Sequence, residues 1–120
     1  MTKAAVRKAK AFTAERAEAE PTLREFWESM LVEIEVDTLE QLDQVLPEGP
    51  DVVLLDNMPP AVLREGVRKR NAVAPNVELE ASGGINLQAI AAIAATGIER
   101  ISSGALTHSA ISLDIALDWL

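Results

Sequence analysis

A pair of glycines between a predicted strand and a predicted helix is the first feature of this sequence that could do chemistry. A β-branched and apolar run predicts a strand over 77–81, and an alanine-rich run predicts a helix over 86–96. Between them lie Ser82, Gly83 and Gly84. Glycine lets the backbone approach a ligand closely, and the first N–H groups of a helix lack internal partners and carry partial positive charge. This turn could therefore hold an anion such as phosphate. The same residues taken alone could also form a tight turn without a ligand.

A second glycine turn follows the next predicted strand, which covers 100–103. Gly104 and Ala105 come directly after that strand, and His108 is the one histidine in the sequence. Glycine turns after neighbouring strands are typical of the phosphate site of (β/α) barrels. The imidazole of His108 could contact a ligand or cap the turn through a hydrogen bond, and the sequence leaves both open.

Carboxylates occupy the predicted strands as well. Side chains alternate along a strand, so Glu35 and Glu80 lie on faces opposite the apolar side chains, and Asp56 ends an apolar strand over 52–56. We expect the apolar faces to pack against helices and these carboxylates to point into a barrel interior or crevice. Beside phosphate turns, Glu35 and Asp56 suggest a phosphorylated sugar and Mg²⁺, which prefers oxygen ligands. The alternative is an edge strand whose glutamates face solvent.

The elements that must position these residues alternate between strand and helix. Alternation, capping residues and prolines predict the order 31–36, 38–46, 52–56, 60–72, 77–81, 86–96 and 100–103. Four successive βα units predict an α/β fold, either a small doubly wound sheet or about half of an incomplete (β/α) barrel. Half a barrel leaves strand edges unpaired, so we expect a homo-oligomer or strands supplied by a missing part. The tail over 113–120 is interpreted as a strand, with a short helix as the alternative.

The first 30 residues do not follow this pattern. We assign 1–30 to an N-terminal helical segment and 31–120 to the barrel part. Residues 3–12 predict a basic helix with Val6 on its apolar side, and Pro21 suits the start of a second helix. Apolar residues at helical spacing then predict a packing face formed by Leu23, Phe26, Trp27 and Met30.

Composition narrows the classes of function. A chain of 120 residues with 48% hydrophobic residues allows one domain with a modest core. The net charge of −8 argues against binding nucleic acid. The absence of cysteine excludes disulfides and thiolate metal sites and fits a reducing cytosol. No apolar run reaches the length of a membrane span, and no signal-peptide pattern opens the chain. We therefore expect a soluble cytoplasmic protein with no membrane or nucleic-acid partner.

The motifs occur in the order and spacing of the quinolinate phosphoribosyltransferase family, also called nicotinate-nucleotide pyrophosphorylase (carboxylating). Four segments carry the resemblance, over 32–37, 54–57, 79–85 and 104–109, and it extends loosely to the helix over 3–12. The resemblance implies the C-terminal, incomplete barrel part of a two-domain, dimeric enzyme. That family is a pentosyltransferase of NAD biosynthesis, which converts quinolinate and phosphoribosyl pyrophosphate to nicotinate mononucleotide, CO₂ and pyrophosphate.

The resemblance also implies roles for individual residues. Two catalytic carboxylates, Glu35 and Asp56, would hold the ribose hydroxyls and Mg²⁺, and would stabilise the positive charge that develops at C1′. The implied phosphate cradle consists of Ser82, Gly83 and Gly84 on one side and Gly104 and Ala105 on the other. Further candidate substrate contacts are Asn57, Glu80 and His108.

The sequence departs from the family where activity is concerned. The family's upstream Lys-Asp-Asn-His stretch and the Arg and Lys residues that bind the carboxylates of quinolinate have no counterpart. Residues 13–30 do not resemble the family's short connection, and Ser103 stands where valine is usual. We therefore expect an incomplete quinolinate site, an uncompensated acidic interior and a fragment that is not active alone. The alternatives are a non-catalytic half-barrel that binds a phosphorylated ligand or a partner chain, and an unrelated βα phosphosugar enzyme.

Overall fold

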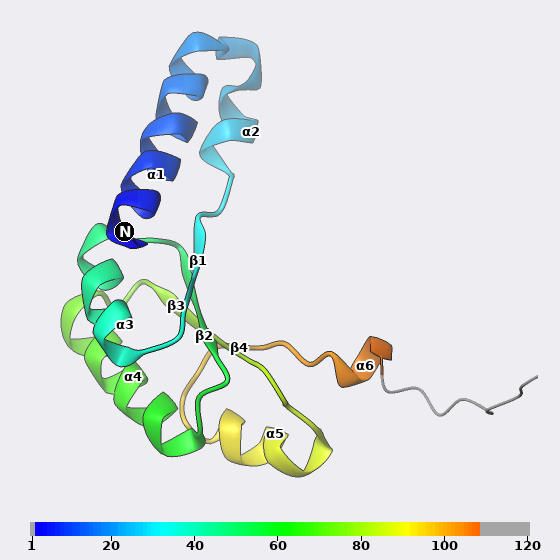
Figure 1. Cartoon of the computed structure of the whole chain (residues 1–120). Helices are drawn as coiled ribbons and strands as arrows, with labels where there is room; N and C mark the ends of the chain where they lie inside the picture. The colour runs from blue at the N-terminus through cyan, green and yellow to red at the C-terminus, as the bar shows by residue number, and fades with distance from the viewer. Residues whose placement is uncertain (1, 109–120) are drawn as a thin grey trace, which may run out of the picture.

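A parallel sheet of four strands forms the centre of the computed structural model, which describes residues 2–108 (Figure 1). The strands lie side by side in chain order, β1-β2-β3-β4. Their bounds are β1 Glu33–Val36, β2 Val52–Asp56, β3 Glu78–Ser82 and β4 Arg100–Ile101. The predicted strands are all present, but β1 starts two residues later than predicted and β4 ends two residues earlier.

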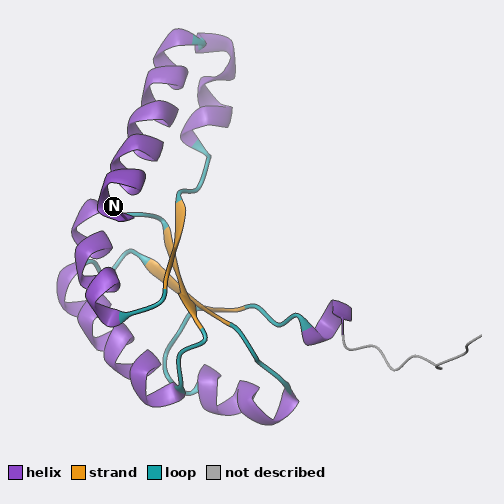
Figure 2. Cartoon of the chain, viewed as in Figure 1, coloured by secondary structure: helices purple, strands orange, loops and turns teal. Residues whose placement is uncertain are grey.

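Helices connect the strands and precede the first one (Figure 2). Their bounds are α1 Thr2–Ala19, α2 Arg24–Glu28, α3 Leu39–Val45, α4 Pro60–Val73, α5 Leu87–Ala94 and α6 Ala105–His108, with short 3₁₀ helices at η1 Pro21–Leu23 and η2 Leu46–Glu48. The helices predicted after β1, β2 and β3 are thus confirmed as α3, α4 and α5. The predicted C-terminal strand over 113–120 lies outside the described residues.

Capping residues set the starts of two of these helices. The Thr38 hydroxyl accepts the N–H of Gln41 at 3.2 Å at the start of α3. The Gln41 side chain accepts the N–H of Asp37 at 2.7 Å, so the reciprocal bond reaches one residue further back than a capping box requires. Asn86, predicted as the first helical residue, is instead the N-cap of α5.

The core lies between one face of the sheet and the helices. Val36, Leu55 and Ala81 are neighbours in register on β1, β2 and β3, and each is at most 2% exposed. The same apolar cluster includes Leu42 of α3 and Leu63 of α4. The alternation of the strands therefore directs their apolar side chains toward the helices and their carboxylates to the opposite face, as predicted.

A buried arginine joins α4 to the starts of β3 and β4. The guanidinium of Arg70, a residue that is only 5% exposed, donates to the carbonyl oxygen of Val77 and to Oε1 of Glu99, both at 2.6 Å. Oε2 of Glu99 accepts the N–H of Leu79 at 2.9 Å. Partial burial alone would raise the pKa of Glu99, but the hydrogen bonds from Arg70 and Leu79 outweigh it and hold that pKa below its usual value.

The first two helices form a hairpin that projects from the sheet (Figure 1). Helix α1 extends to Ala19, well beyond the predicted end at residue 12. Val6, at the base of the hairpin, is 1% exposed and belongs to the same core as the strands. Trp27 packs edge-to-face against Phe12 and Phe26, with ring centroids 5.9 and 5.2 Å away. The division of the chain at residue 30 stays a prediction.

The predicted packing face of this hairpin is formed only in part. Trp27 is half-buried, but the other three residues keep between 41% and 52% of their surface exposed: Leu23, Phe26 and Met30. Only Phe26 and Trp27 lie in α2, because Leu23 ends η1 and Met30 follows the helix, and α2 packs mainly against α1. Within residues 2–108, no helix is both long and apolar enough to cross a bilayer.

Candidate functional site

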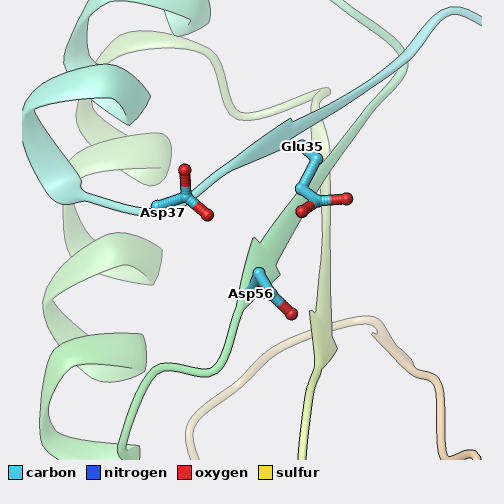
Figure 3. Close-up of side chains that lie close together, drawn as sticks. All are labelled: Glu35, Asp37 and Asp56. Carbon is cyan, nitrogen blue, oxygen red and sulfur yellow. The ribbon is translucent and has the colours of Figure 1, made fainter.

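Three carboxylates meet where β1 and β2 end (Figure 3). Glu35 lies in β1, Asp37 follows its last residue, and Asp56 is the last residue of β2. One carboxylate oxygen from each lies within 4.8 Å of the other two. The parallel register pairs Val36 with Leu55, so the next step along both strands places Asp37 beside Asp56.

This acidic cluster has the donor chemistry of a site for a hard divalent cation. Glu35 and Asp37 are exposed and Asp56 is half-buried, so the oxygens are open to a ligand. Mg²⁺ binds through one or two carboxylates together with water and substrate phosphate, and three converging oxygens fit that requirement. Glu35 and Asp56 were predicted and are brought together. Asp37 was missed, although its spacing of two residues from Glu35 puts both on the same face of the chain.

The turn after β3 is in close contact with the turn after β2. Gly83 has φ 88° and Gly84 has φ 63°, and Asn57 is the one non-glycine residue with positive φ among those described. The N–H of Asn57 donates to the carbonyl oxygen of Ser82 at 2.8 Å. A Cβ at Gly83 would lie 2.9 Å from the backbone nitrogen of Asn57. This close approach requires glycine at position 83, and it brings the predicted glycine pair next to the residue that follows Asp56.

The glycine turn presents unpaired N–H groups. Within residues 2–108, no protein hydrogen bond uses the backbone N–H of residues 83–86 as its donor. Further along α5, the N–H groups of Gln88 and Ala89 donate to the Asn86 side chain at 3.1 and 3.0 Å. Successive free N–H groups ahead of a helix make a concave site for an anion. The turn after β3 therefore has backbone donors that an anion could accept, and anion binding there stays a prediction.

The turn after β4 lies beside the turn after β3. The N–H of Ser102 donates to the carbonyl oxygen of Ala81 at 2.9 Å and prolongs the pairing of the two strands. The hydroxyl of Ser103 donates to the carbonyl oxygen of Ile85 at 2.6 Å. The two halves of the predicted cradle, Ser82–Gly84 and Gly104–Ala105, therefore belong to neighbouring turns. His108 is the last residue of α6, and the structure does not describe its imidazole.

Two carboxylates deeper on this face, Glu78 and Glu80, have partners within the protein, contrary to expectation. Arg100 of β4 pairs with Glu78 of β3 at 2.5 Å, and the hydroxyl of Ser102 donates to Glu80. Arg100 could have been identified from the alternation of side chains along the strand, because it lies two residues from Ser102 and therefore on the same face. Glu80 is thus engaged within the protein. Asp56 and Ser82 are register partners at the carboxyl-end edge of the sheet, which we call the rim, and Glu80 lies two residues before Ser82 in β3.

Two cavities lie near the sheet. One, of about 510 Å³, lies at the opposite end of the strands against Asp51 and Val77. Another, of about 400 Å³, lies between α5 and α6 and is lined largely by apolar side chains such as Leu87 and Leu106. Parallel α/β proteins bind ligands at the carboxyl ends of their strands, so we place the site at the carboxylate and glycine rim and not in the cavity beside Asp51. The cavity between α5 and α6 adjoins that rim, because Asn86, Ser103 and Ala105 are among its lining residues.

Comparison with known proteins gives a consistent result. The family model described as quinolinate phosphoribosyl transferase, C-terminal domain, matches residues 4–118. The nicotinate-nucleotide pyrophosphorylase (carboxylating) of Mycobacterium leprae is 50% identical over 86 residues, covering 72% of this chain and 30% of that protein. The human protein of the same name is 38% identical over 108 residues, covering 90% of this chain and 34% of that protein.

Solved structures agree with the sequence relatives. The nicotinate-nucleotide pyrophosphorylase of Francisella tularensis matches with a TM-score of 0.62 and 34% identity, over 82% of this chain and 34% of that one. The expected α/β fold, as part of a barrel, is confirmed. The chain spans about a third of the length of these relatives. Because the family match runs over residues 4–118, this chain belongs to the quinolinate phosphoribosyl transferase family, in the part that forms the C-terminal domain.

Proposed function

We propose that this chain provides the phosphoribosyl-binding part of a quinolinate phosphoribosyltransferase. The complete enzyme would join quinolinate to the ribosyl group of phosphoribosyl pyrophosphate and release CO₂ and pyrophosphate. The observation that carries the proposal is the placement of an acidic cluster and a turn of free N–H groups on adjacent strand ends. Carboxylates suit the ribose hydroxyls and the N–H groups suit a phosphate, so both ends of a ribose phosphate would find a partner.

The residues of the rim have separable tasks in this reaction. The N–H groups of residues 83–86 would bind the phosphate and fix the ribose relative to the carboxylates. Glu35, Asp37 and Asp56 would accept hydrogen bonds from the ribose hydroxyls and place negative charge near the carbon that becomes cationic. The same three oxygens would hold Mg²⁺, which supplies charge neutralisation for the pyrophosphate when bound.

We also propose that the quinolinate carboxylates are bound by parts of the enzyme outside the described residues. Arg100, the cation on the carboxylate-bearing face of β4, is already paired with Glu78. A dicarboxylate needs cationic partners, and the cluster at β1 and β2 would repel it. A homo-oligomer, or a partner part that covers the edges of β1 and β4, would supply such groups. The cytoplasm, where NAD synthesis would take place, fits a chain without cysteine.

Isothermal titration of the 120-residue chain with phosphoribosyl pyrophosphate and Mg²⁺ tests the proposal. We expect binding by the wild-type chain and at least tenfold weaker binding by Asp56→Asn, which removes one charge of the cluster. Asp43→Asn is the matched control, because Asp43 pairs with Lys69 on the helical side. We expect no nicotinate mononucleotide when quinolinate is added. Failure of the wild-type chain to bind, or equal loss in both variants, would contradict the phosphoribosyl assignment.

A further inference from the structure

Ser103 is the side chain that joins the two glycine turns. It follows β4, and its hydroxyl donates a hydrogen bond of 2.6 Å to the carbonyl oxygen of Ile85, 18 residues earlier in the chain. Ile85 is 6% exposed and stands directly after Gly84, within the turn whose N–H groups are free. The bond therefore acts on the anion-binding turn itself.

This bond constrains the peptide between Ile85 and Asn86. In a trans peptide the C=O and the N–H of one plane point in opposite directions, and no peptide bond among the described residues is cis. Holding the Ile85 carbonyl toward Ser103 therefore also sets the direction of the Asn86 N–H. That N–H is one of the four free donors of the turn.

Apart from the Ile85 side chain, which is buried in the core, the turn has little other restraint from side chains. Gly83 and Gly84 have none of their own, and both adopt positive φ, where glycine is free to move toward other conformations. The Asn57 N–H restrains the beginning of the turn through Ser82, and the Asn86 side chain restrains the helix that follows. The bond from Ser103 acts between these two points.

We infer that Ser103 is a positioning residue for anion binding, which holds the Ile85–Asn86 peptide in its binding orientation and joins both halves of the cradle. The inference rests on the proposed function, because the anion concerned is the phosphate of a phosphoribosyl ligand. The hydroxyl acts through the backbone of residues 85–86 and does not itself contact the ligand.

Two variants of nearly equal shape isolate the hydroxyl. Ser103→Thr keeps the donor, and Ser103→Val replaces it with a methyl group at the same branch point. With ribose 5-phosphate as the probe in isothermal titration, we expect Ser103→Thr to bind like the wild type. We expect Ser103→Val to bind about fivefold more weakly, the usual effect of one lost hydrogen bond.

A second measurement separates positioning from general destabilisation. Mg²⁺ alone, titrated into each variant, reports on Glu35, Asp37 and Asp56 at the ends of β1 and β2, and its affinity should not change. Equal ribose 5-phosphate affinity in the two variants would overturn the inference and leave the proposed function standing. Loss of both ligands in Ser103→Val would also overturn it, because the effect would then be structural. No ribose 5-phosphate binding by the wild-type chain would overturn the proposed function and the inference together.

Discussion

Gly83 and Gly84 share a left-handed backbone but differ in their surroundings. A Cβ at Gly83 would meet the backbone nitrogen of Asn57 at 2.9 Å, whereas the nearest atom to a Cβ at Gly84 lies 3.9 Å away. At Gly84 an alanine adds only the strain of positive φ, roughly 1 kcal/mol. At Gly83 the contact with a neighbouring turn adds to that strain.

We therefore expect Gly83→Ala to lower the free energy of unfolding by about 3 kcal/mol and Gly84→Ala by about 1 kcal/mol. Urea unfolding followed by circular dichroism measures both. The phosphate affinity of Gly83→Ala should fall as well, because relief of the contact with Asn57 requires the turn to move. Equal destabilisation by the two variants would show that the turns after β2 and β3 are not in tight contact.

The sequence predicted those residues of the candidate site whose positions follow from the alternation of side chains along a strand or from the residue types that a turn requires. Glu35, Asp56 and the glycine pair follow from strand alternation and from the needs of a βα turn. Asp37 was missed because it lies beyond the strand, where alternation was not extended. The bond from Ser103 to Ile85 joins residues far apart in the chain, and no local pattern contains that information.

Two of the arginines of α4 show how burial decides how much an ion pair contributes to stability. Arg70 is buried and joins Val77 and Glu99 to the helix, whereas Arg68 pairs with Glu65 on the exposed side of α4. Loss of one partner from a buried pair leaves the other groups without compensation, which costs about 3 kcal/mol. An exposed pair within a helix contributes about 0.5 kcal/mol at most.

We expect Arg70→Met to lower the free energy of unfolding by about 3 kcal/mol and Arg68→Met by no more than about 0.5 kcal/mol. The two variants change the same side chain in the same helix, so helix propensity is matched. Thermal and urea unfolding provide the measurement. A small effect of Arg70→Met would mean that the starts of β3 and β4 do not depend on this arginine.

Glu99 should make stability depend on pH in the acid range. Its pKa in the folded protein lies below the ordinary value of 4.5. The charged form is thus favoured by folding, and the stabilisation is complete above the unfolded-state pKa and lost as the pH falls through the folded-state pKa. Glu99→Gln should be less stable than the wild type at pH 7, with a difference that shrinks below about pH 4. Urea unfolding at several pH values would test this, and a difference independent of pH would contradict it.

The elements themselves were largely predictable because their signals are local. Apolar alternation, Thr38 as a cap and Pro60 at a helix start define β1, α3 and α4 within a few residues. The length of α1 was not predictable, because residues 13–19 lack an apolar stripe. Their helix is supported by contacts with α2, including Arg16 over the ring of Trp27 at 5.3 Å.

At the scale of the whole molecule, the α1–α2 hairpin has fewer contacts with the buried core than the sheet has. Among the described residues, Val6 is the hairpin residue that belongs to the buried core. The aromatic group of Phe12, Phe26 and Trp27 is not part of that core. Segments with few buried contacts open at lower free energy than the core. The hairpin's outer part should therefore open without unfolding of the sheet.

Hydrogen exchange with two matched variants can show this. Trp27→Ala should speed amide exchange over α2 and leave Val53 and Leu55 of β2 protected. Val6→Ala removes core volume, should cost about 2 kcal/mol, and should reduce protection in β2 as well. If Trp27→Ala exposed β2 to exchange, the hairpin and the sheet would form one cooperative unit.

The strand order β1-β2-β3-β4 has a consequence for how the chain acquires its structure during synthesis. Among residues 2–108, β2, β3 and β4 each pair with the strand made just before, and none of them must be inserted between two strands that already exist. Each pairing closes a loop of one helix and its connections, which keeps the entropic cost of each step similar. The sheet can thus grow from β1 toward β4 as the ribosome releases each unit, with the acidic rim assembled before the second glycine turn emerges.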